Sequence, residues 1–142
     1  MGDERELQDA VSRFVRAFGL HQPDQTPCGR PIPVSEAHAL GELARDGTLR
    51  QNDLAHRLRL EKSTTSRLVT QLINRGWAER TTAPDDGRGV LVRLTTAGAK
   101  AAEQLAEARA ARFAAVLERV PPDERTGVLH ALTILTEAMD EP

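Results

Sequence analysis

The chain has 142 residues, of which 39% are hydrophobic and 28% charged, and its formal net charge is −2. This size allows one domain whose core needs no disulfide or metal, and the composition excludes a disordered chain. The single cysteine excludes an intramolecular disulfide. No apolar run reaches the roughly 18–20 residues that would cross a membrane. Because the N-terminus also has no apolar signal segment, the sequence predicts a cytoplasmic protein without membrane association.

The charge is unevenly distributed along the chain. Residues 50–93 hold nine basic and five acidic side chains, a local net charge of +4, which leaves −6 for the rest. A basic middle between acidic ends favours a local phosphate-facing surface over a protein that binds nucleic acid along its whole length.

The N-terminal third is predicted to contain two helices joined by a loop. Apolar residues at spacings of three and four predict a helix over residues 3–18. Residues 19–34 include four prolines and two glycines, so they are predicted to form an irregular connection. A loop of this length within a compact domain is often functional. Ser35 is the expected N-cap of the next helix, and Gly47 is its expected end.

The middle of the chain carries the most specific pattern. A minimal strand at 48–49 precedes two short amphipathic helices, predicted over 51–58 and 62–75. Trp77–Thr81 and Val90–Leu94 are predicted to pair as antiparallel strands, because the segment between them is rich in turn-forming residues. Two helices followed by a two-stranded ribbon are typical of a winged helix-turn-helix DNA-binding domain.

The C-terminal part is predicted to be helical. Thr95 or Thr96 is expected to cap a long alanine-rich helix that ends near Arg119, and a last helix is predicted over residues 122–139. The predicted fold class is therefore mainly α with a small β-wing. Three regions are expected: an N-terminal dimerisation helix with its loop, the winged domain, and C-terminal dimerisation helices, over residues 1–34, 35–98 and 99–142.

The terminal helices carry apolar stripes that one small winged domain can cover only in part. The simplest solution is a homodimer in which these helices interleave, since symmetric dimers are the commonest oligomers. The alternative is that each helix packs back on its own domain.

The second helix of a helix-turn-helix enters the major groove with its N-terminal residues at the base edges. Leu68 and Leu72 must face the core, and Thr65 shares their side. Short hydroxyl side chains allow close approach of the backbone, and Arg67 can bind guanine through two hydrogen bonds. The predicted DNA contacts are the outward residues Lys62, Ser63, Thr64, Ser66, Arg67, Thr70, Gln71 and Asn74.

The tip of the predicted wing contains Arg88 between two glycines. An arginine at such a tip can enter a narrow minor groove, where the negative potential is enhanced. Asp86, two residues earlier, could hold the Arg88 side chain in place. The alternative is an exposed hairpin with a surface ion pair worth about 0–1 kcal/mol.

In combination, LAHRLRLEKSTTSRLVTQLINRGW at 54–77 and DDGRGVLVRLTTAG at 85–98 resemble the MarR family of bacterial transcriptional regulators. The D-x-R wing followed by a strand and L-T-x-x-G is specific as a set. The resemblance implies a dimer, acting as a repressor, that binds a pseudo-palindromic double-stranded DNA operator, with Asp86 and Arg88 as the wing pair. Glu61 departs from the usual pattern, in which Ser, Asp or Asn caps the recognition helix.

The resemblance also implies a switch, through a small-molecule effector, cysteine oxidation or zinc. Arg30 lies near enough to Cys28 in sequence to favour a thiolate. His21, Cys28 and His38 could supply three zinc ligands, but their spacing matches no tight motif, so no metal or cofactor is assigned. The favoured interpretation is that the proline-rich loop lines a small-molecule pocket.

Catalytic motifs are missing from the sequence. It contains no phosphate-binding glycine loop, no H-E-x-x-H pattern and no nucleophile elbow, so it is not predicted to be an enzyme. The remaining alternative is a winged helix that serves only as a protein-interaction module. The basic segment 50–93 argues against it, and a salt-dependent shift of duplex DNA would discriminate the two.

Overall fold

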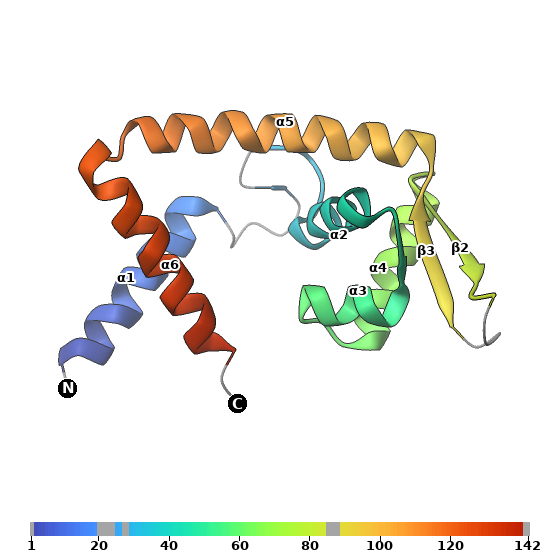
Figure 1. Ribbon diagram of the computed structural model, residues 1–142, viewed down its shortest axis with the longest axis horizontal. Helices are drawn as coiled ribbons and strands as arrows, with labels where there is room; N and C mark the ends of the chain where they lie inside the picture. Colours follow the sequence, from blue (N-terminus) through green and yellow to red (C-terminus); the bar gives the residue numbers. More distant parts are fainter. Residues whose placement is uncertain (1, 20–24, 27–28, 85–88, 141–142) are drawn as a thin grey trace. The chain divides into compact units, whose positions relative to one another are not determined.

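The computed structural model describes residues 2–19, 25–26, 29–84 and 89–140. These residues divide into two compact units, Met1–Ala108 and Arg109–Pro142. None of the helices in the described ranges is long and apolar enough to cross a membrane. The elements, of which Figure 1 labels the α-helices and the strands β2 and β3, are α1 (Gly2–Phe18), α2 (Val34–Asp46), β1 (Thr48–Arg50), α3 (Gln51–Leu58), α4 (Lys62–Asn74), β2 (Ala78–Thr82), β3 (Val90–Leu94), α5 (Thr96–Glu118), the 3-10 turn η1 (Pro122–Glu124) and α6 (Arg125–Met139).

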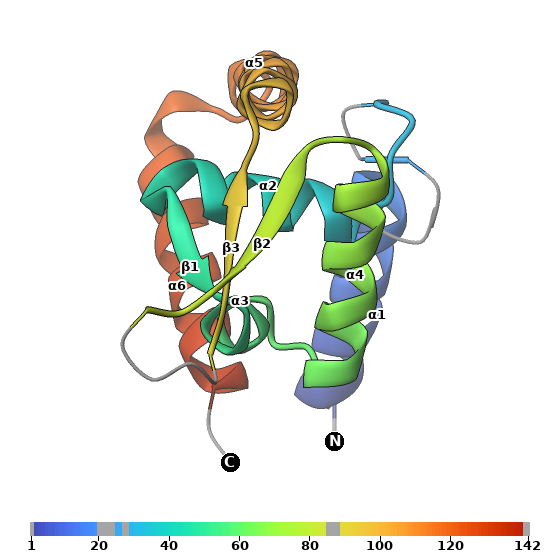
Figure 2. The same ribbon diagram turned by 90° about the vertical axis from the view of Figure 1, so that its right-hand side faces the viewer.

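The three strands form one antiparallel sheet with β3 in the centre, in the order β1-β3-β2 (Figure 2). Val92 of β3 lies opposite Leu49 on one side and Arg80 on the other. The predicted ribbon and the minimal preceding strand are thus confirmed. Strand β2 begins one residue later than predicted, because the Trp77 N–H donates to Leu72 O (3.0 Å) and so closes the end of α4.

The core of the first unit is aliphatic and small. The helices α2, α3 and α4 bury leucines against the sheet, and Thr65 of α4 is also fully buried, as its place in the helical pattern predicts. The predicted fold class, mainly α with a small β-wing, is confirmed. The largest fully buried side chains are Leu40, Leu43, Leu54, Leu72, Val69, Val92 and Thr65.

The start of α2 differs from the prediction. The helix begins at Val34 with Pro33 as its N-cap, whereas Ser35 was the expected cap. Proline suits this N-cap because the N-cap is extended here, which its fixed φ allows, and because the N–H it lacks would have no partner within the helix. Glu36 then falls three residues after the cap, but its carboxylate bonds Arg75 instead of closing a capping box.

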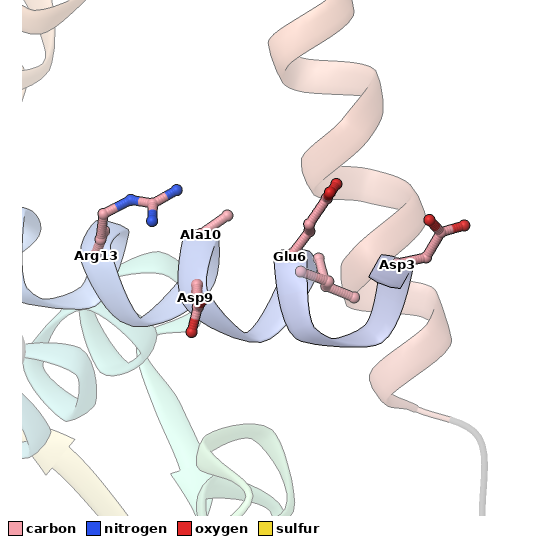
Figure 3. Close-up of a pocket in the computed structure, with 6 residues that line it drawn as sticks. Asp3, Glu6, Asp9, Ala10 and Arg13 are labelled. Carbon is pink, nitrogen blue, oxygen red and sulfur yellow. The ribbon is translucent and has the colours of Figure 1, made fainter. Parts of the chain in front are cut away.

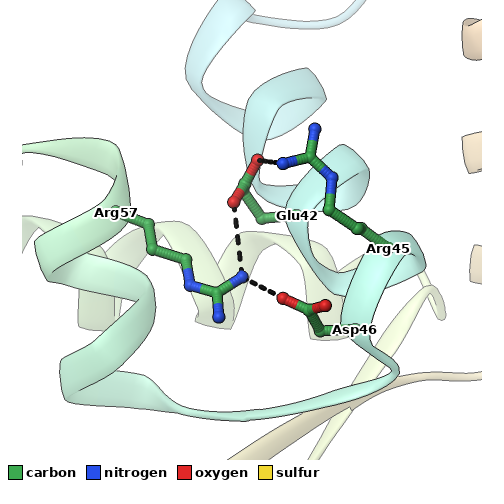
Figure 4. Close-up of polar contacts among 4 residues, drawn as sticks. All are labelled: Glu42, Arg45, Asp46 and Arg57. Carbon is green, nitrogen blue, oxygen red and sulfur yellow. Dashed lines mark hydrogen bonds and ion pairs between the residues drawn. The ribbon is translucent and has the colours of Figure 1, made fainter.

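A polar cluster on the surface connects α2 to α3 (Figure 4). Arg57 of α3 forms ion pairs with Asp46 and with Glu42 (3.5 Å), and Glu42 also pairs with Arg45 at 3.7 Å. The hydrogen bond to Asp46 is the main cause that raises the pKa of the Arg57 guanidinium above its ordinary value. Arg57 therefore keeps its charge and shares it with carboxylates of its own chain.

The start of α5 is fixed by Thr95. Its Oγ1 accepts a hydrogen bond from Gly98 N (3.0 Å) and donates to Gly76 O (2.6 Å), so Thr95 is the cap, one of the two predicted. Its N–H donates to Trp77 O (3.0 Å). A Cβ at Gly98 would lie 1.9 Å from that same Trp77 oxygen. The helix can approach the chain between α4 and β2 this closely only because residue 98 is a glycine.

The second unit contains the end of α5, η1 and α6. The last helix was predicted from residue 122, but Pro122–Glu124 forms a 3-10 turn and α6 begins at Arg125, whose Nε donates to Val120 O (3.2 Å). Helix α6 has no buried residue, and large apolar side chains on it are exposed, among them Leu129 (65%) and Ile134 (51%). Helix α1 of the first unit likewise has no buried residue.

Candidate nucleic-acid interface

The turn between α3 and α4 is tight and requires an unusual backbone conformation. Arg59 adopts the left-handed region, with φ of 57°, and caps α3. The Leu60 N–H then donates to Ala55 O (3.0 Å). Helix α4 starts at Lys62, three residues after the left-handed residue, and this arrangement completes a helix-turn-helix.

The N-terminus of α4 lacks a side-chain cap. Glu61 occupies the N-cap position without a side-chain hydrogen bond to the helix. The Thr65 hydroxyl, which lies within the helix, donates to Glu61 O (3.0 Å). The first N–H groups of a helix have no partner within the helix, and they create a positive end that attracts anions. The first turn of α4 is therefore chemically suited to a phosphate or a base edge.

The predicted contact residues lie away from the core. Thr64 and Ser66 are half-buried, and Arg67 Nη2 donates to Thr64 Oγ1 (3.4 Å). The predicted wing residues Asp86 and Arg88 lie outside the described residues. The side chains exposed on α4 are those of Lys62, Ser63, Arg67, Thr70, Gln71 and Asn74.

The net charge of segment 50–93 overstates the positive charge that is available to a ligand. Arg57, Arg75 and Arg93 are paired with carboxylates. Lys62 and Arg67, by contrast, are exposed and form no ion pair within the described part of the chain. Two cations without an ion pair in the described residues thus lie on the first two turns of α4, close to its positive helix end.

Arg80 of β2 is a site residue that sequence reasoning missed. Its Nη2 donates to Ser66 O (2.7 Å) and to Thr70 Oγ1 (3.1 Å), and its Nε donates to Gln51 Oε1 (3.0 Å). One guanidinium therefore joins β2 to both helices of the helix-turn-helix. A signal did exist in the sequence: side chains alternate along a strand, so Arg80 shares the face of buried Ala78.

A cavity of about 160 Å³ lies within the first unit, between the end of the proline-rich loop and α5. The loop end is held in place, since Thr26 N donates to Arg30 O (2.9 Å) and Arg30 N to Thr26 Oγ1 (3.0 Å). The cavity is smaller than the roughly 300–1,000 Å³ pockets of drug-sized ligands. Its lining combines one cation, one amide and apolar groups: Arg30, Pro31, Ile32, Trp77, Ala101, Gln104 and Leu105.

A second hollow follows α1 and is lined by residues of that helix alone (Figure 3). Asp3, Glu6 and Asp9 give it an acidic character, and Arg13 is its one cation. A surface formed by one side of a single helix cannot enclose a ligand, so this hollow is not assigned a function.

The predicted effector residues are not brought together by what the structure describes. His38 is exposed on α2 and does not line the cavity. His21 and Cys28 lie outside the described residues. Among the residues that are described, no group of three His, Cys, Asp or Glu side chains could hold a metal ion. The zinc and redox hypotheses therefore stay untested predictions.

Comparison with known proteins finds similarity in sequence and in fold. A sequence model of the MarR family matches residues 31–89. The HTH-type transcriptional regulator YfiV of Bacillus subtilis is 31% identical over 138 residues, which are 97% of this chain and 86% of the relative. The MepR–DNA complex of S. aureus has a TM-score of 0.72 and 25% identity, and the match covers 95% of this chain and 96% of that one. NadR in complex with 4-hydroxyphenylacetate is similar in fold, with a TM-score of 0.68, 24% identity and coverage of 100% and 95%.

Proposed function

The chain belongs to the MarR family of transcriptional regulators, which are DNA-binding proteins and not enzymes, and we propose that it is a dimeric repressor released by a small-molecule effector. Its target is a pseudo-palindromic duplex operator. Each protomer presents one α4 to the major groove, and two-fold symmetry places the half-sites about 34–36 Å apart, or a multiple of that.

The observation that carries this proposal is the chemistry at the start of α4. The helix end is uncapped by side chains, and Lys62 and Arg67 beside it are exposed without an ion pair in the described residues. A protein-interaction module has no need for positive charge concentrated on the outer face of its second helix. Backbone N–H groups and lysine suit phosphate, while arginine and amides suit base edges.

Selection of bound duplexes from a random pool tests DNA recognition. We expect a palindromic consensus and an affinity that falls steeply as salt rises, because phosphate contacts release counterions. A protein that shifts no duplex, or shifts all of them equally, would refute sequence-specific binding. A winged helix used only as a protein-interaction module would show no shift at all.

Exposed apolar side chains support the homodimer. On α1, Leu7 and Phe14 are 48% and 52% exposed, and Phe14 stacks on Phe18 with 5.6 Å between the ring centroids. On α6, Leu129 and Met139 are each 65% exposed. Soluble proteins rarely leave large contiguous apolar patches in water, so a second copy of the chain is the proposed cover for both helices.

Sedimentation over a range of protein concentrations tests the dimer. We expect a dimer at micromolar concentration and no stable folded monomer, because the terminal helices lose their apolar cover when the protomers separate. A well-folded monomer at that concentration would contradict the proposal.

The cavity beside Trp77 supports release by a small molecule. Its apolar walls suit a single ring, and Arg30 with Gln104 suits a carboxylate or another small anion. NadR was solved with 4-hydroxyphenylacetate, a ring with a carboxylate. We therefore propose a small aromatic acid as the effector. It can release the operator only if it binds the DNA-free form more tightly than the DNA-bound form.

Trp77 is the only tryptophan in the chain, so its fluorescence reports on the cavity directly. Titration with 4-hydroxyphenylacetate is expected to change this fluorescence and to weaken operator binding over the same concentration range. Arg30→Gln should lower the affinity for the acid, and Arg45→Gln, which changes an exposed arginine outside the cavity, should not. A fluorescence change with unaltered operator affinity would remove the regulatory part of the proposal.

A further inference from the structure

We propose that Arg80 is a positioning residue for DNA recognition: it fixes the rotation of α4 about its axis, and so decides which side chains face the bases. The inference rests on the proposed sequence-specific function. It also reassigns two of the predicted DNA contacts, Ser66 and Thr70, to the support of α4.

Arg80 contacts α4 at two successive turns. Ser66 and Thr70 are four residues apart and therefore lie on the same face of the helix. The Arg80 Nη2 donates to the carbonyl oxygen of Ser66 (2.7 Å) and to the hydroxyl oxygen of Thr70 (3.1 Å). The two acceptors lie 3.0 Å apart, so Arg80 Nη2 holds one point at the side of α4, and rotation of the helix about its axis would move both acceptors away from it.

The hydroxyl of Thr70 is already in use. It donates to Ser66 O (3.0 Å) and accepts from Arg80, so its only proton is committed within the protein. By helical periodicity Ser63, Arg67 and Asn74 follow the exposed, outermost line of α4, exposed Thr70 lies ~40° from that line and half-buried Ser66 lies ~80° from it. Thr70 is therefore set apart by its committed hydroxyl and not by its angle. We infer that base reading falls on the outermost line.

The third contact of Arg80 joins the first helix of the motif. Its Nε donates to Gln51 Oε1 (3.0 Å), and Gln51 is the first residue of α3. The guanidinium therefore fixes the position of α4 relative to both α3 and β2, the first strand of the wing. Lysine cannot reproduce this, because its ammonium lacks the planar fork that directs several donors at fixed angles.

Arg93 offers a matched control on the neighbouring strand. Glu79 lies opposite Arg93 in the sheet, and Arg93 Nε donates to Glu79 Oε1 (2.5 Å). Arg93 is 57% exposed, and within the described residues it forms no hydrogen bond or ion pair with α4 or α3. Replacing either arginine removes one positive charge near the wing, but only Arg80 supports the recognition helix.

The experiment compares the parent, Arg80→Lys, Arg80→Gln and Arg93→Gln. Each protein is titrated with the selected operator and with a scrambled duplex at several salt concentrations, below its unfolding temperature. We expect both Arg80 variants to lose about tenfold in the operator-to-scrambled affinity ratio, the scale of one specific base contact. The slope of log affinity against log salt should stay as in the parent, and Arg93→Gln should keep the ratio.

The salt slope separates positioning from direct phosphate binding. An arginine that contacts a phosphate lowers that slope by about 1 when it is removed, and it weakens all duplexes alike. A lower slope with an unchanged ratio for Arg80→Gln would therefore overturn the assignment. So would an unchanged ratio in Arg80→Lys. A parent that binds no duplex would instead refute the proposed function itself.

Thr70→Val provides a second test that keeps the fold, since Thr70 is exposed and the two side chains are similar in shape. It should lower the operator-to-scrambled ratio in the parent but add nothing in the Arg80→Lys background, because both changes break the same contact. Asn74→Ala, which lies on the outermost line, should lower the ratio in the parent and by a smaller factor in the Arg80→Lys background, because a helix whose rotation is released no longer holds Asn74 at its base. Additive effects of Thr70→Val and Arg80→Lys would overturn the proposal.

Discussion

Arg75 Nε donates a 2.7 Å hydrogen bond to Oε1 of Glu36, whose side chain is only 3% exposed. Arg75 caps the C-terminus of α4, and Glu36 lies in the first turn of α2. The Arg75 guanidinium also lies 5.1 Å from the centroid of the Trp77 ring, a cation–π distance. Since Trp77 lines the cavity, a ligand there would touch the residue that stacks against the end of the recognition helix.

Glu36→Gln tests the stabilising role of this buried contact. The amide preserves the shape and one acceptor but loses the charge, so Arg75 Nε keeps only a neutral partner. We expect the free energy of unfolding in urea to fall by about 1–3 kcal/mol. Glu61→Gln is the control, because Glu61 is exposed and makes no capping bond, and it should stay within about 0.5 kcal/mol. Equal stability of the two variants would contradict this account of Glu36.

Gly98→Ala tests the close approach of α5 to the segment after α4. A methyl group at this position would lie 1.9 Å from Trp77 O, and a backbone atom cannot move aside as a side chain can. Overpacking of this kind typically costs about 1–3 kcal/mol, so the thermal unfolding midpoint should fall clearly.

Gly127→Ala in α6 is the control, and the expected change in stability has the opposite sign. No atom lies within 4 Å of a Cβ built there, and its backbone is helical. Gly127→Ala should therefore raise stability by roughly 0.5–1 kcal/mol through helix propensity. If Gly98→Ala is also neutral or stabilising, the approach of α5 to Trp77 is not as close as the geometry indicates.

Local signals predicted most of the fold. The apolar spacing at Leu54, Ala55 and Leu58 gave the bounds of α3, and the turn-rich segment after Thr82 predicted the β2–β3 pair. The start of α2 could not be predicted in this way. Ser35 was the expected cap, but Pro33 holds that position. Glu36 of the first turn bonds Arg75, which lies 39 residues away, and no local pattern reports a contact over that distance.

The candidate site was likewise predicted only in part from the sequence. Helical periodicity was sufficient to place Lys62, Ser63 and Arg67 outward and Thr65 inward. The role of Arg80 depends on tertiary contacts with two helices, so a count of basic residues treated it as surface charge. The cavity likewise combines the loop end, Trp77 and α5, three segments that only folding brings together.

Arg67→Ala tests base reading by the exposed arginine of α4. Arg67 makes only one weak contact with Thr64 (3.4 Å) in the described residues, so its guanidinium can turn toward a guanine. We expect a loss of roughly 1–3 kcal/mol in discrimination between the operator and a duplex with the contacted base changed. The affinities for both duplexes are measured at one salt concentration. Unchanged discrimination would show that Arg67 does not recognise a base.

Arg88→Ala tests the wing, and this prediction rests on the sequence because Arg88 lies outside the described residues. If Arg88 enters the minor groove, its loss should weaken binding most where the flanking sequence is an A-tract, whose minor groove is narrow. Major-groove discrimination should be retained. The same loss on A-tract and G·C-rich flanks would indicate a phosphate contact in place of minor-groove recognition.

Ala101→Leu tests whether the cavity is the effector site. Ala101 is half-buried on α5 and lines the cavity, so a leucine there would fill part of the space of about 160 Å³. Operator binding should be kept, since Ala101 lies outside α4, but 4-hydroxyphenylacetate should no longer weaken it. Ala99→Leu, on an exposed position of the same helix, should respond like the parent. If Ala101→Leu is still released by the acid, the effector binds elsewhere, and oxidation of Cys28 or a site outside the described residues becomes the next hypothesis to test.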